Sequence, residues 1–398
     1  MSTARAIRRV ADVLLVCTAA SATLSITGME IGIAGLFVLG LLGGAAGVPV
    51  LRRTPFDGPL AVLAAVLLLS TLASGRPWEA TGYGKLWVVG GYFGVYWWLT
   101  DAERVARCWR VFLGTAAVVA VYAIAQHFTG IDWYRDLTGR PRALAPRVAG
   151  GAGYASVGFF SNYLTFGHAL VLPLGGAAAA AVGAAWPAVL AAAAMVAAIV
   201  FSTARGAWLA ALCMGATLAV VGRSRRLLAV PALLLGVGAA VLAASPDLRA
   251  QVPPLASLEG INAHRLAIYR ANLDIVRAHP VFGLGFGRYR PAAKPYYEPH
   301  PMADRRSHAH NNFLQMAAEA GLLGVFAFTF LFAAVLRRAA EALPRAGPAW
   351  PRLCGAMVAL VGFLAGGLTQ YNFGDNEVAI GMWLTLAVLA REVEAADA

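Results

Sequence analysis

Charged side chains are scarce in this sequence: Asp, Glu, Lys and Arg make up 13% of its 398 residues, while 59% are hydrophobic. A water-soluble domain has roughly a quarter of its residues charged, so this composition excludes an ordinary soluble protein. It places the chain among proteins that cross the membrane many times.

Cysteines and metal-binding patterns are also sparse. The four cysteines, Cys17, Cys108, Cys213 and Cys354, all lie in or beside apolar runs, so we expect neither disulfides nor a cysteine metal cluster. No CxxC, HExxH or P-loop motif occurs, and the polar segments lack the paired carboxylates that hold Mg²⁺ or Mn²⁺. We therefore expect a protein with no metal site and no cofactor.

Long apolar runs are abundant instead, and we count about twelve. A helix needs about 20 apolar residues to cross a bilayer, and some of these runs are shorter. The sequence predicts an all-α polytopic membrane protein that forms a single integral domain over residues 1–398. The runs lie at residues 10–26, 29–50, 59–73, 86–100, 109–127, 160–183, 187–203, 206–222, 227–244, 315–336, 353–369 and 378–390.

Basic residues predict how these helices are oriented. Most of the short connections on one side contain arginines, for example Arg52–Arg53 and Arg337–Arg338, and such positive charge stays on the cytoplasmic side. Both termini are then cytoplasmic, and two long polar segments, 128–158 and 245–312, lie on the outer side. We expect the second segment to be a large, partly helical loop that carries site residues.

The net charge of +12 would suggest a nucleic-acid partner in a soluble protein. Here about half of the basic residues flank cytoplasmic helix ends, so we expect no nucleic acid. The other half lie on the outer side, where membrane insertion does not require them, and this suggests an anionic ligand. The alternative is that an arginine-rich composition simply fills the outer segments.

Arginines on the outer side are candidates for binding that ligand. A predicted helix over residues 262–279 places Arg265 and Asn272 between two apolar stripes, and an inward arginine is costly without a partner. One stripe consists of Leu266, Tyr269, Leu273 and Val276 and the other of Ile268 and Ile275, while Arg270, Asp274 and Arg277 lie on the opposite face. Arg288 follows a glycine-rich turn, which suits either close approach of a ligand or a plain turn. Arg205 lies in the turn 202–208, where it either reaches the headgroups or joins the others in clamping a pyrophosphate.

Polar residues at the outer ends of two apolar runs are further candidates. His308 and His310 precede Asn311 at the start of one run. A neutral imidazole can accept the proton of an attacking hydroxyl. Tyr163 and His168 lie near the outer end of another run, and they either line the same cavity or hydrogen-bond between helices.

The residues around His310 resemble those of the O-antigen ligase family. The family pattern is His, then Asn, Ser or Gln, then nine residues, then Gly-x-x-Gly. Here His310-Asn311 is followed by residues 312–320 and then by Gly321-Leu322-Leu323-Gly324. The large outer segment and the layout of about twelve helices are also similar. The specific similarity lies at residues 202–208, 262–290 and 308–324.

The resemblance implies a GT-C-type glycosyltransferase in the inner membrane of a Gram-negative bacterium, with a periplasmic active site among membrane lipids. The implied reaction moves a glycan from an undecaprenyl-pyrophosphate-linked O-antigen to a sugar hydroxyl of lipid A-core, with inversion and without metal. By motif position, His310, Arg205 and Arg265 match the family's functional residues. Substrate contacts are expected from Arg288 and His308, which occupy no motif position, and from Asn311, His168 and Tyr163.

Three other functions remain open. An O-antigen polymerase would share the topology but use another lipid-linked repeat as acceptor, and a protein O-oligosaccharyltransferase would use a protein hydroxyl. The full match to the His-Asn pattern favours the ligase. A lipid-linked glycan transporter belongs to a different class. Transporters often show repeated halves and charges at the membrane midplane, and this sequence shows neither.

Overall fold

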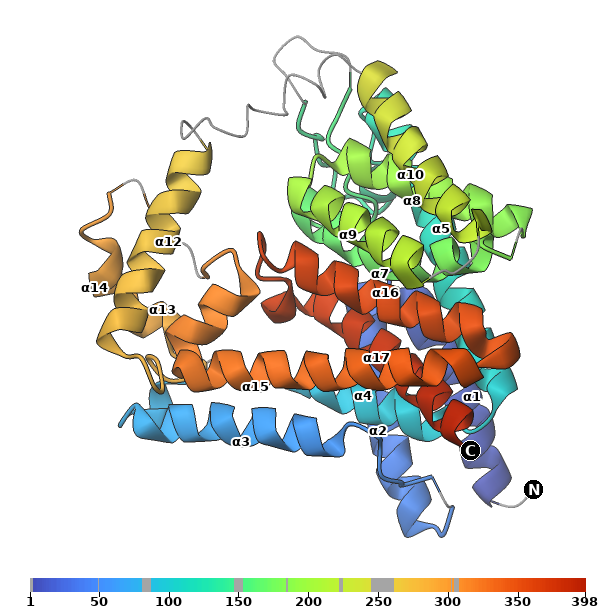
Figure 1. The fold of residues 1–398 in the computed structure, drawn as a ribbon, viewed down its shortest axis with the longest axis horizontal. Coiled ribbons are helices and arrows are strands. Elements are labelled where there is room, and N and C mark those ends of the chain that lie inside the picture. Colours follow the sequence, from blue (N-terminus) through green and yellow to red (C-terminus); the bar gives the residue numbers. More distant parts are fainter. Residues whose placement is uncertain are drawn as a thin grey trace.

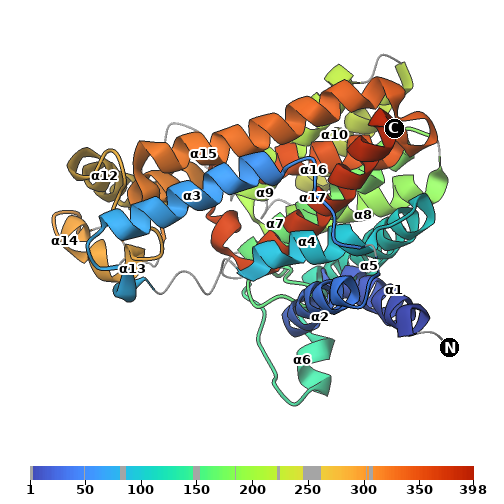
Figure 2. The ribbon, with the colours of Figure 1, turned by 90° about the horizontal axis from the view of Figure 1, so that it is seen from below.

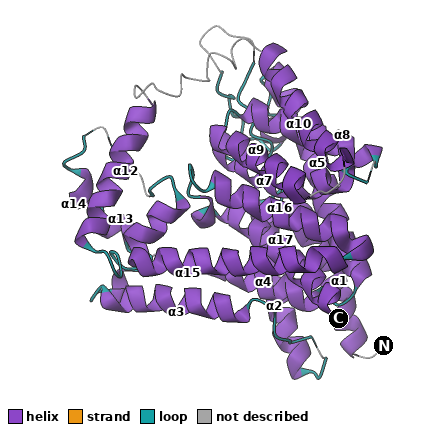
Figure 3. Cartoon of the chain, in the orientation of Figure 1, coloured by secondary structure: helices purple, strands orange, loops and turns teal. Residues whose placement is uncertain are grey.

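The computed structural model describes residues 3–48, 50–80, 87–146, 153–183, 185–221, 225–244, 261–301, 303 and 308–398. Within these ranges the regular structure is helical, apart from an isolated bridge between Pro146 and Tyr154 (Figure 3). The predicted outer segments 128–158 and 245–312 are therefore described only in part.

Every apolar run contains a helix, which confirms the all-helical prediction. A run of hydrophobic residues cannot satisfy its backbone groups in lipid unless it forms a helix or a closed barrel. These helices are α1 (Thr3–Ser21), α2 (Ile26–Ala45), α3 (Asp57–Ala73), α4 (Val89–Trp98), α5 (Ala102–Thr129), α7 (Tyr163–Ala181), α8 (Trp186–Ser202), α9 (Arg205–Val221), α10 (Arg225–Ala244), α15 (Asn312–Ala342), α16 (Trp350–Gly366) and α17 (Asn376–Asp397).

Five helical segments in the described part of the chain are long and apolar enough to cross a membrane: Ile26–Ala45, Ala102–Thr129, Tyr163–Ala181, Asn312–Arg345 and Gly347–Gly366. Three shorter apolar helices are α3, α8 and α9. The structure thus supports a polytopic membrane protein. It does not establish twelve spans, because several of the helices are short; α4, for instance, has 10 residues.

Small residues bring α7 and α16 together at the centre of the bundle. A side chain at Gly175 would come within 2.7 Å of the backbone of both Gly355 and Ala359, and one at Gly355 would come within 2.8 Å of Gly176. Close approach of this kind provides van der Waals contact between membrane helices, where lipid offers no hydrophobic driving force.

The helices are arranged so that α3 and α15 lie side by side and extend beyond the rest of the bundle (Figures 1 and 2). Their far ends meet a smaller unit of α12 (Ile261–Ala278), α13 (Tyr289–Ala292) and α14 (Lys294–Tyr297). In both views the two termini lie at the opposite end of the molecule from this unit.

The predicted faces of α12 are largely confirmed. Ile268 and Ile275 are buried, and Arg265 is half-buried, whereas Arg277 is exposed and pairs with Asp274 at 2.7 Å. Leu273 is the exception, since it was expected in an apolar stripe and is exposed. These contacts fix which face of α12 is turned towards the protein.

Three buried polar side chains join α12 to α13 and α14. Asn272 donates to the Tyr297 hydroxyl at 3.1 Å and accepts from the Tyr289 hydroxyl at 2.8 Å. Burial raises the pKa of Tyr289 and of Tyr297, so both phenols stay protonated and can donate hydrogen bonds. The small unit therefore has its own polar core.

The segment 128–158, predicted to lie on the outer side, is tied to the bundle where the structure describes it. Asp132, which precedes the short helix α6 (Trp133–Leu137), is buried and accepts from Tyr122 of α5 and from Arg142. Arg142 also donates to the carbonyl groups of Phe160 and Ser161. Arg142 thereby links this segment to the approach to α7.

Candidate active site

His310 has the most constrained backbone of the predicted site residues. It adopts a left-handed conformation with φ of 52°, and its side chain is 5% exposed. Such a conformation is costly for a residue other than glycine, and it persists only where the surroundings hold it. The imidazole Nδ1 lies 2.9 Å from Oε1 of Gln370, and His308 stacks edge-on at 4.2 Å between ring centroids.

Asn311 and Asn312 explain how this conformation is held. Asn311 caps α15, because its Oδ1 accepts from the backbone of Phe313 and Leu314. Its side-chain nitrogen donates to the Leu368 carbonyl at 2.8 Å. The Asn312 backbone donates to the Gly367 carbonyl at 2.7 Å. Asn311 thus has a structural role, whether or not it also contacts substrate.

The connection between α16 and α17 supplies partners that the sequence did not reveal. Asn312 donates to Asn372 at 2.5 Å, and Gln370 and Tyr371 both face the histidines. Burial, together with the negative charge of Glu319, holds the pKa of Tyr371 well above its usual value. A polar run, Thr369–Asn372, between two apolar helices was the available signal.

The Gly-x-x-Gly part of the motif marks a break in α15. Gly321 has φ of 65° and ψ of −166°, a region that is essentially restricted to glycine. A side chain there would overlap the Val281 carbonyl oxygen and lie 2.6 Å from the Phe282 nitrogen. Gly321 therefore leaves space for the turn that follows α12.

The glycine-rich turn 283–287 packs against α15 just before the break at Gly321. Leu284 and Gly285 donate backbone hydrogen bonds to Ala318 and Glu319 at 2.9 and 3.0 Å. A side chain at Gly283 would lie 2.5 Å from the carbonyl carbon of Glu319. The turn packs against α15, so its glycines have a structural explanation.

Arg265 and Tyr269 bring α12 to the histidine segment. The Tyr269 hydroxyl lies 3.4 Å from the carbonyl oxygens of His310 and Leu368. Burial raises the pKa of Tyr269, and the positive charge of Arg265 opposes that shift. Arg265 also interacts electrostatically with His168 of α7. Arg265 thus interacts with Tyr269 of its own helix and with the predicted site residue His168.

Arg205 begins α9 on the same side of the bundle. The preceding Thr203 has φ of 63° and ends α8, while Gly206 packs against His168 and Thr369. A side chain at Gly206 would overlap the Thr369 hydroxyl and lie 2.9 Å from His168 Nε2. The turn thereby places Gly206, the residue after half-buried Arg205, beside His168, and His168 in turn interacts electrostatically with Arg265.

In the described part of the chain, Arg288 and Tyr163 have other surroundings than this group. Arg288 is 8% exposed and pairs with Glu79 at 2.5 Å, and it also donates to the Leu284 carbonyl. These contacts connect the glycine-rich turn to the residues beyond α3. Tyr163 is exposed at the first position of α7. Substrate binding by either residue stays a prediction.

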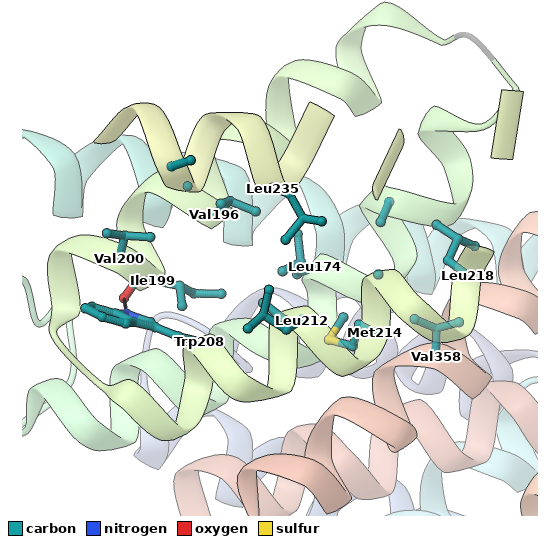
Figure 4. A pocket seen from close by; sticks show the side chains of 15 residues that line it. Leu174, Val196, Ile199, Val200, Trp208, Leu212, Met214, Leu218, Leu235 and Val358 are labelled. Atoms are coloured by element: carbon teal, nitrogen blue, oxygen red, sulfur yellow. Dashed lines mark hydrogen bonds between the residues drawn. The ribbon is translucent and has the colours of Figure 1, made fainter. Parts of the chain in front are cut away.

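An apolar cavity of about 270 Å³ lies among α7, α8, α9 and α10 (Figure 4). Trp208 and Leu218, one near each end, lie on the same face of α9, and Leu174, Val196 and Leu235 come from the other helices. Its walls suit a hydrocarbon and not a phosphate. Among the described residues, no group of three or more His, Cys, Asp and Glu side chains is arranged to hold a metal ion.

Comparison with known proteins agrees with the motif. A family model described as O-antigen ligase matches residues 190–329, which run from α8 into α15 and include Arg205, Arg265 and His310. No curated protein matches the chain. The match places residues 190–329 of this membrane protein in the O-antigen ligase family, whose members are glycosyltransferase-like enzymes of O-antigen processing.

Proposed function

We propose that this protein is an O-antigen ligase of the GT-C type in the inner membrane of a Gram-negative bacterium. The donor is a glycan on undecaprenyl pyrophosphate, and the acceptor is a sugar hydroxyl of lipid A-core. The reaction takes place at the periplasmic face, inverts the anomeric centre and uses no metal. The family match supports the reaction class, and the arrangement of His310, Arg265 and Arg205 supports the assignment of roles.

The observation that carries the proposal is the setting of His310. Its backbone is held in a left-handed conformation, its ring is buried, and its Nδ1 is hydrogen-bonded to Gln370. A fixed imidazole next to a polar connection is well suited to remove a proton from a hydroxyl group. A histidine with a merely structural role in the helix cap would not need this backbone conformation, because Asn311 already caps α15.

The arginines provide the second half of the chemistry. Arg265 of α12 interacts electrostatically with His168, and Gly206 of α9, the residue after Arg205, packs against the same histidine. Guanidinium groups keep their charge when partly buried and bind phosphate oxygens through two hydrogen bonds. We assign them to the pyrophosphate, whose negative charge grows as it leaves.

The reaction then proceeds as a single displacement at the anomeric carbon. The acceptor hydroxyl oxygen forms a bond to that carbon, and its proton passes to Nε2 of His310. The bond between the anomeric carbon and the pyrophosphate oxygen breaks, and undecaprenyl pyrophosphate leaves with the electron pair beside Arg265 and Arg205. The apolar cavity beside Trp208, three residues beyond Arg205, supports a donor with a hydrocarbon chain.

The placement of the termini supports the proposed orientation. Both termini lie at the end of the molecule away from α12–α14 (Figure 1). At that end the half-buried Arg338 and the exposed Arg345 pair with Asp397 at 2.8 and 2.6 Å. A cytoplasmic location for this basic end puts His310 and Arg265 on the periplasmic side.

The test is the lipopolysaccharide profile of a strain that lacks the protein. Core without O-antigen, together with accumulation of the lipid-linked chains, supports the ligase. Core that carries a single repeat indicates a polymerase, and an unchanged profile points to protein glycosylation or to glycan transport.

Complementation of that strain with His310→Gln should fail, whereas His279→Gln, a matched change at an exposed histidine, should restore the profile. Turnover by a folded His310→Gln enzyme would overturn the assigned base.

A further inference from the structure

Gln370 makes a directional hydrogen bond to the imidazole of His310. Its side chain is 8% exposed, and its Oε1 lies 2.9 Å from Nδ1 of the ring. A carboxamide oxygen can only accept a hydrogen bond, so the proton of the neutral imidazole resides on Nδ1. The lone pair is then on Nε2, the nitrogen that faces away from Gln370.

His308 has the opposite arrangement. Its Nδ1 lies 3.3 Å from the backbone nitrogen of His310 and accepts that N–H, so its proton resides on Nε2. Of the two neighbouring imidazoles, His310 therefore has its acceptor nitrogen at Nε2, whereas His308 has a donor there. The pair offers one base and one hydrogen-bond donor.

We infer that Gln370 is the positioning residue that selects the Nδ1–H tautomer of His310, and so makes Nε2 the atom that takes the acceptor's proton. This inference rests on the proposed function. During the transfer, the hydroxyl proton moves to Nε2 while its oxygen bonds to the anomeric carbon and the pyrophosphate oxygen departs. The imidazolium that forms still donates from Nδ1 to Gln370, which stabilises it without a change of partner.

Because Gln370, the partner of His310 at Nδ1, is uncharged, the tautomer it selects affects how the turnover rate depends on pH. A carboxylate at this place would favour the protonated imidazole before substrate binds, whereas a carboxamide orients the ring without adding a charge. The titratable and charged groups around the segment come from several elements: His308 beside it, Tyr269 and Arg265 of α12, His168 of α7, Glu319 of α15 and Tyr371 of the connection between α16 and α17.

The experiment is a profile of initial rate against pH for the purified protein in detergent, with lipid-linked O-antigen as donor and lipid A-core as acceptor. Gln370→Glu keeps an acceptor at Nδ1 and adds a charge, so the acid limb should move up by about 1 pH unit or more while turnover survives at alkaline pH. Gln370→Leu removes the acceptor, and turnover should fall roughly tenfold or more at every pH.

Two further variants separate the possible failures. Gln126→Leu removes another buried glutamine, one that hydrogen-bonds to the backbone of Val157 and Gly158. It should lower the melting temperature without moving the acid limb. An inactive His310→Gln together with an unshifted Gln370→Glu profile would refute the role of Gln370 alone. An active His310→Gln would instead refute the proposed base.

Discussion

Replacing Gly321 by alanine tests whether the break in α15 is required by the fold. The φ and ψ angles of Gly321 lie in a region that costs other residues about 1–3 kcal/mol. The added methyl group would also overlap the Val281 carbonyl. Relieving that overlap moves the turn and weakens the 2.8 Å hydrogen bond from Leu322 to Pro280, at a cost of about 1 kcal/mol.

These contributions amount to a destabilisation of about 2–4 kcal/mol. The measurement is thermal unfolding of the protein in detergent, followed by tryptophan fluorescence, and we expect the melting temperature to fall by about 2–5 °C. Gly114→Ala is the matched control, since Gly114 lies within α5 and the added methyl group meets nothing within 4 Å beyond its chain neighbours and the nearby backbone of its own helix.

The control should melt at or slightly above the wild-type temperature, because alanine favours a helix by about 1 kcal/mol over glycine. If Gly321→Ala melted with the wild type while the control behaved as expected, the reasoning would be wrong. Such a result would mean that α15 accepts a continuous helix and that the turn after α12 can move aside without loss.

Three further predictions concern the partners of the site. Glu79→Gln should melt below the wild type at pH 7. That difference should vanish as the pH falls, because the hydrogen bond to Arg288 lowers the pKa of Glu79 from its ordinary 4.5 and the stabilisation is lost once the carboxylate is protonated. Arg265→Lys keeps the charge but loses the two-pronged geometry, so initial rates with lipid-linked donor should fall roughly tenfold, equivalent to about 1.4 kcal/mol. Asn312→Leu should lower stability by about 2–3 kcal/mol in the same melting assay, because it leaves Asn372 without its 2.5 Å hydrogen bond in a buried position.

The helices and the inward face of α12 could be predicted, because both depend on the pattern of apolar and polar residues close together in the sequence. Each apolar run forms a helix, since hydrophobic length and backbone satisfaction are local requirements. The alternation of apolar and polar residues also placed Arg265 and Asn272 on the inward face of α12, where the structure has them half-buried and buried. The number of membrane spans was less accessible, because short helices such as α4 do not show their tilt or depth in the sequence.

The partners of the predicted residues could not be read from the sequence. Gln370 lies 60 residues from His310, and Glu79 lies 209 residues from Arg288, and no periodicity connects positions so far apart. The motif marked Gly321, but its backbone conformation could not be predicted from the sequence. Its left-handed conformation follows from the presence of Val281, which reaches it only after the chain has folded.

The spacing between histidine and glycine in the motif has a physical meaning in this fold. Residues 312–320 form nine helical positions, a length of about 14 Å at 1.5 Å per residue. At its start, Asn312 is bound to the connection that carries Gln370, and at its end Gly321 receives the turn that follows α12.

One more or one fewer residue would rotate one end by about 100° relative to the other, and the two attachments could not both form. The motif therefore fixes a distance and a rotation between the α16–α17 connection, which holds Gln370 against His310, and helix α12, which carries Arg265. A fixed spacing is required because the proposed base and the proposed phosphate-binding arginine lie on separate elements. Residues 312–320 and Gly321 hold those two elements at a fixed distance and rotation.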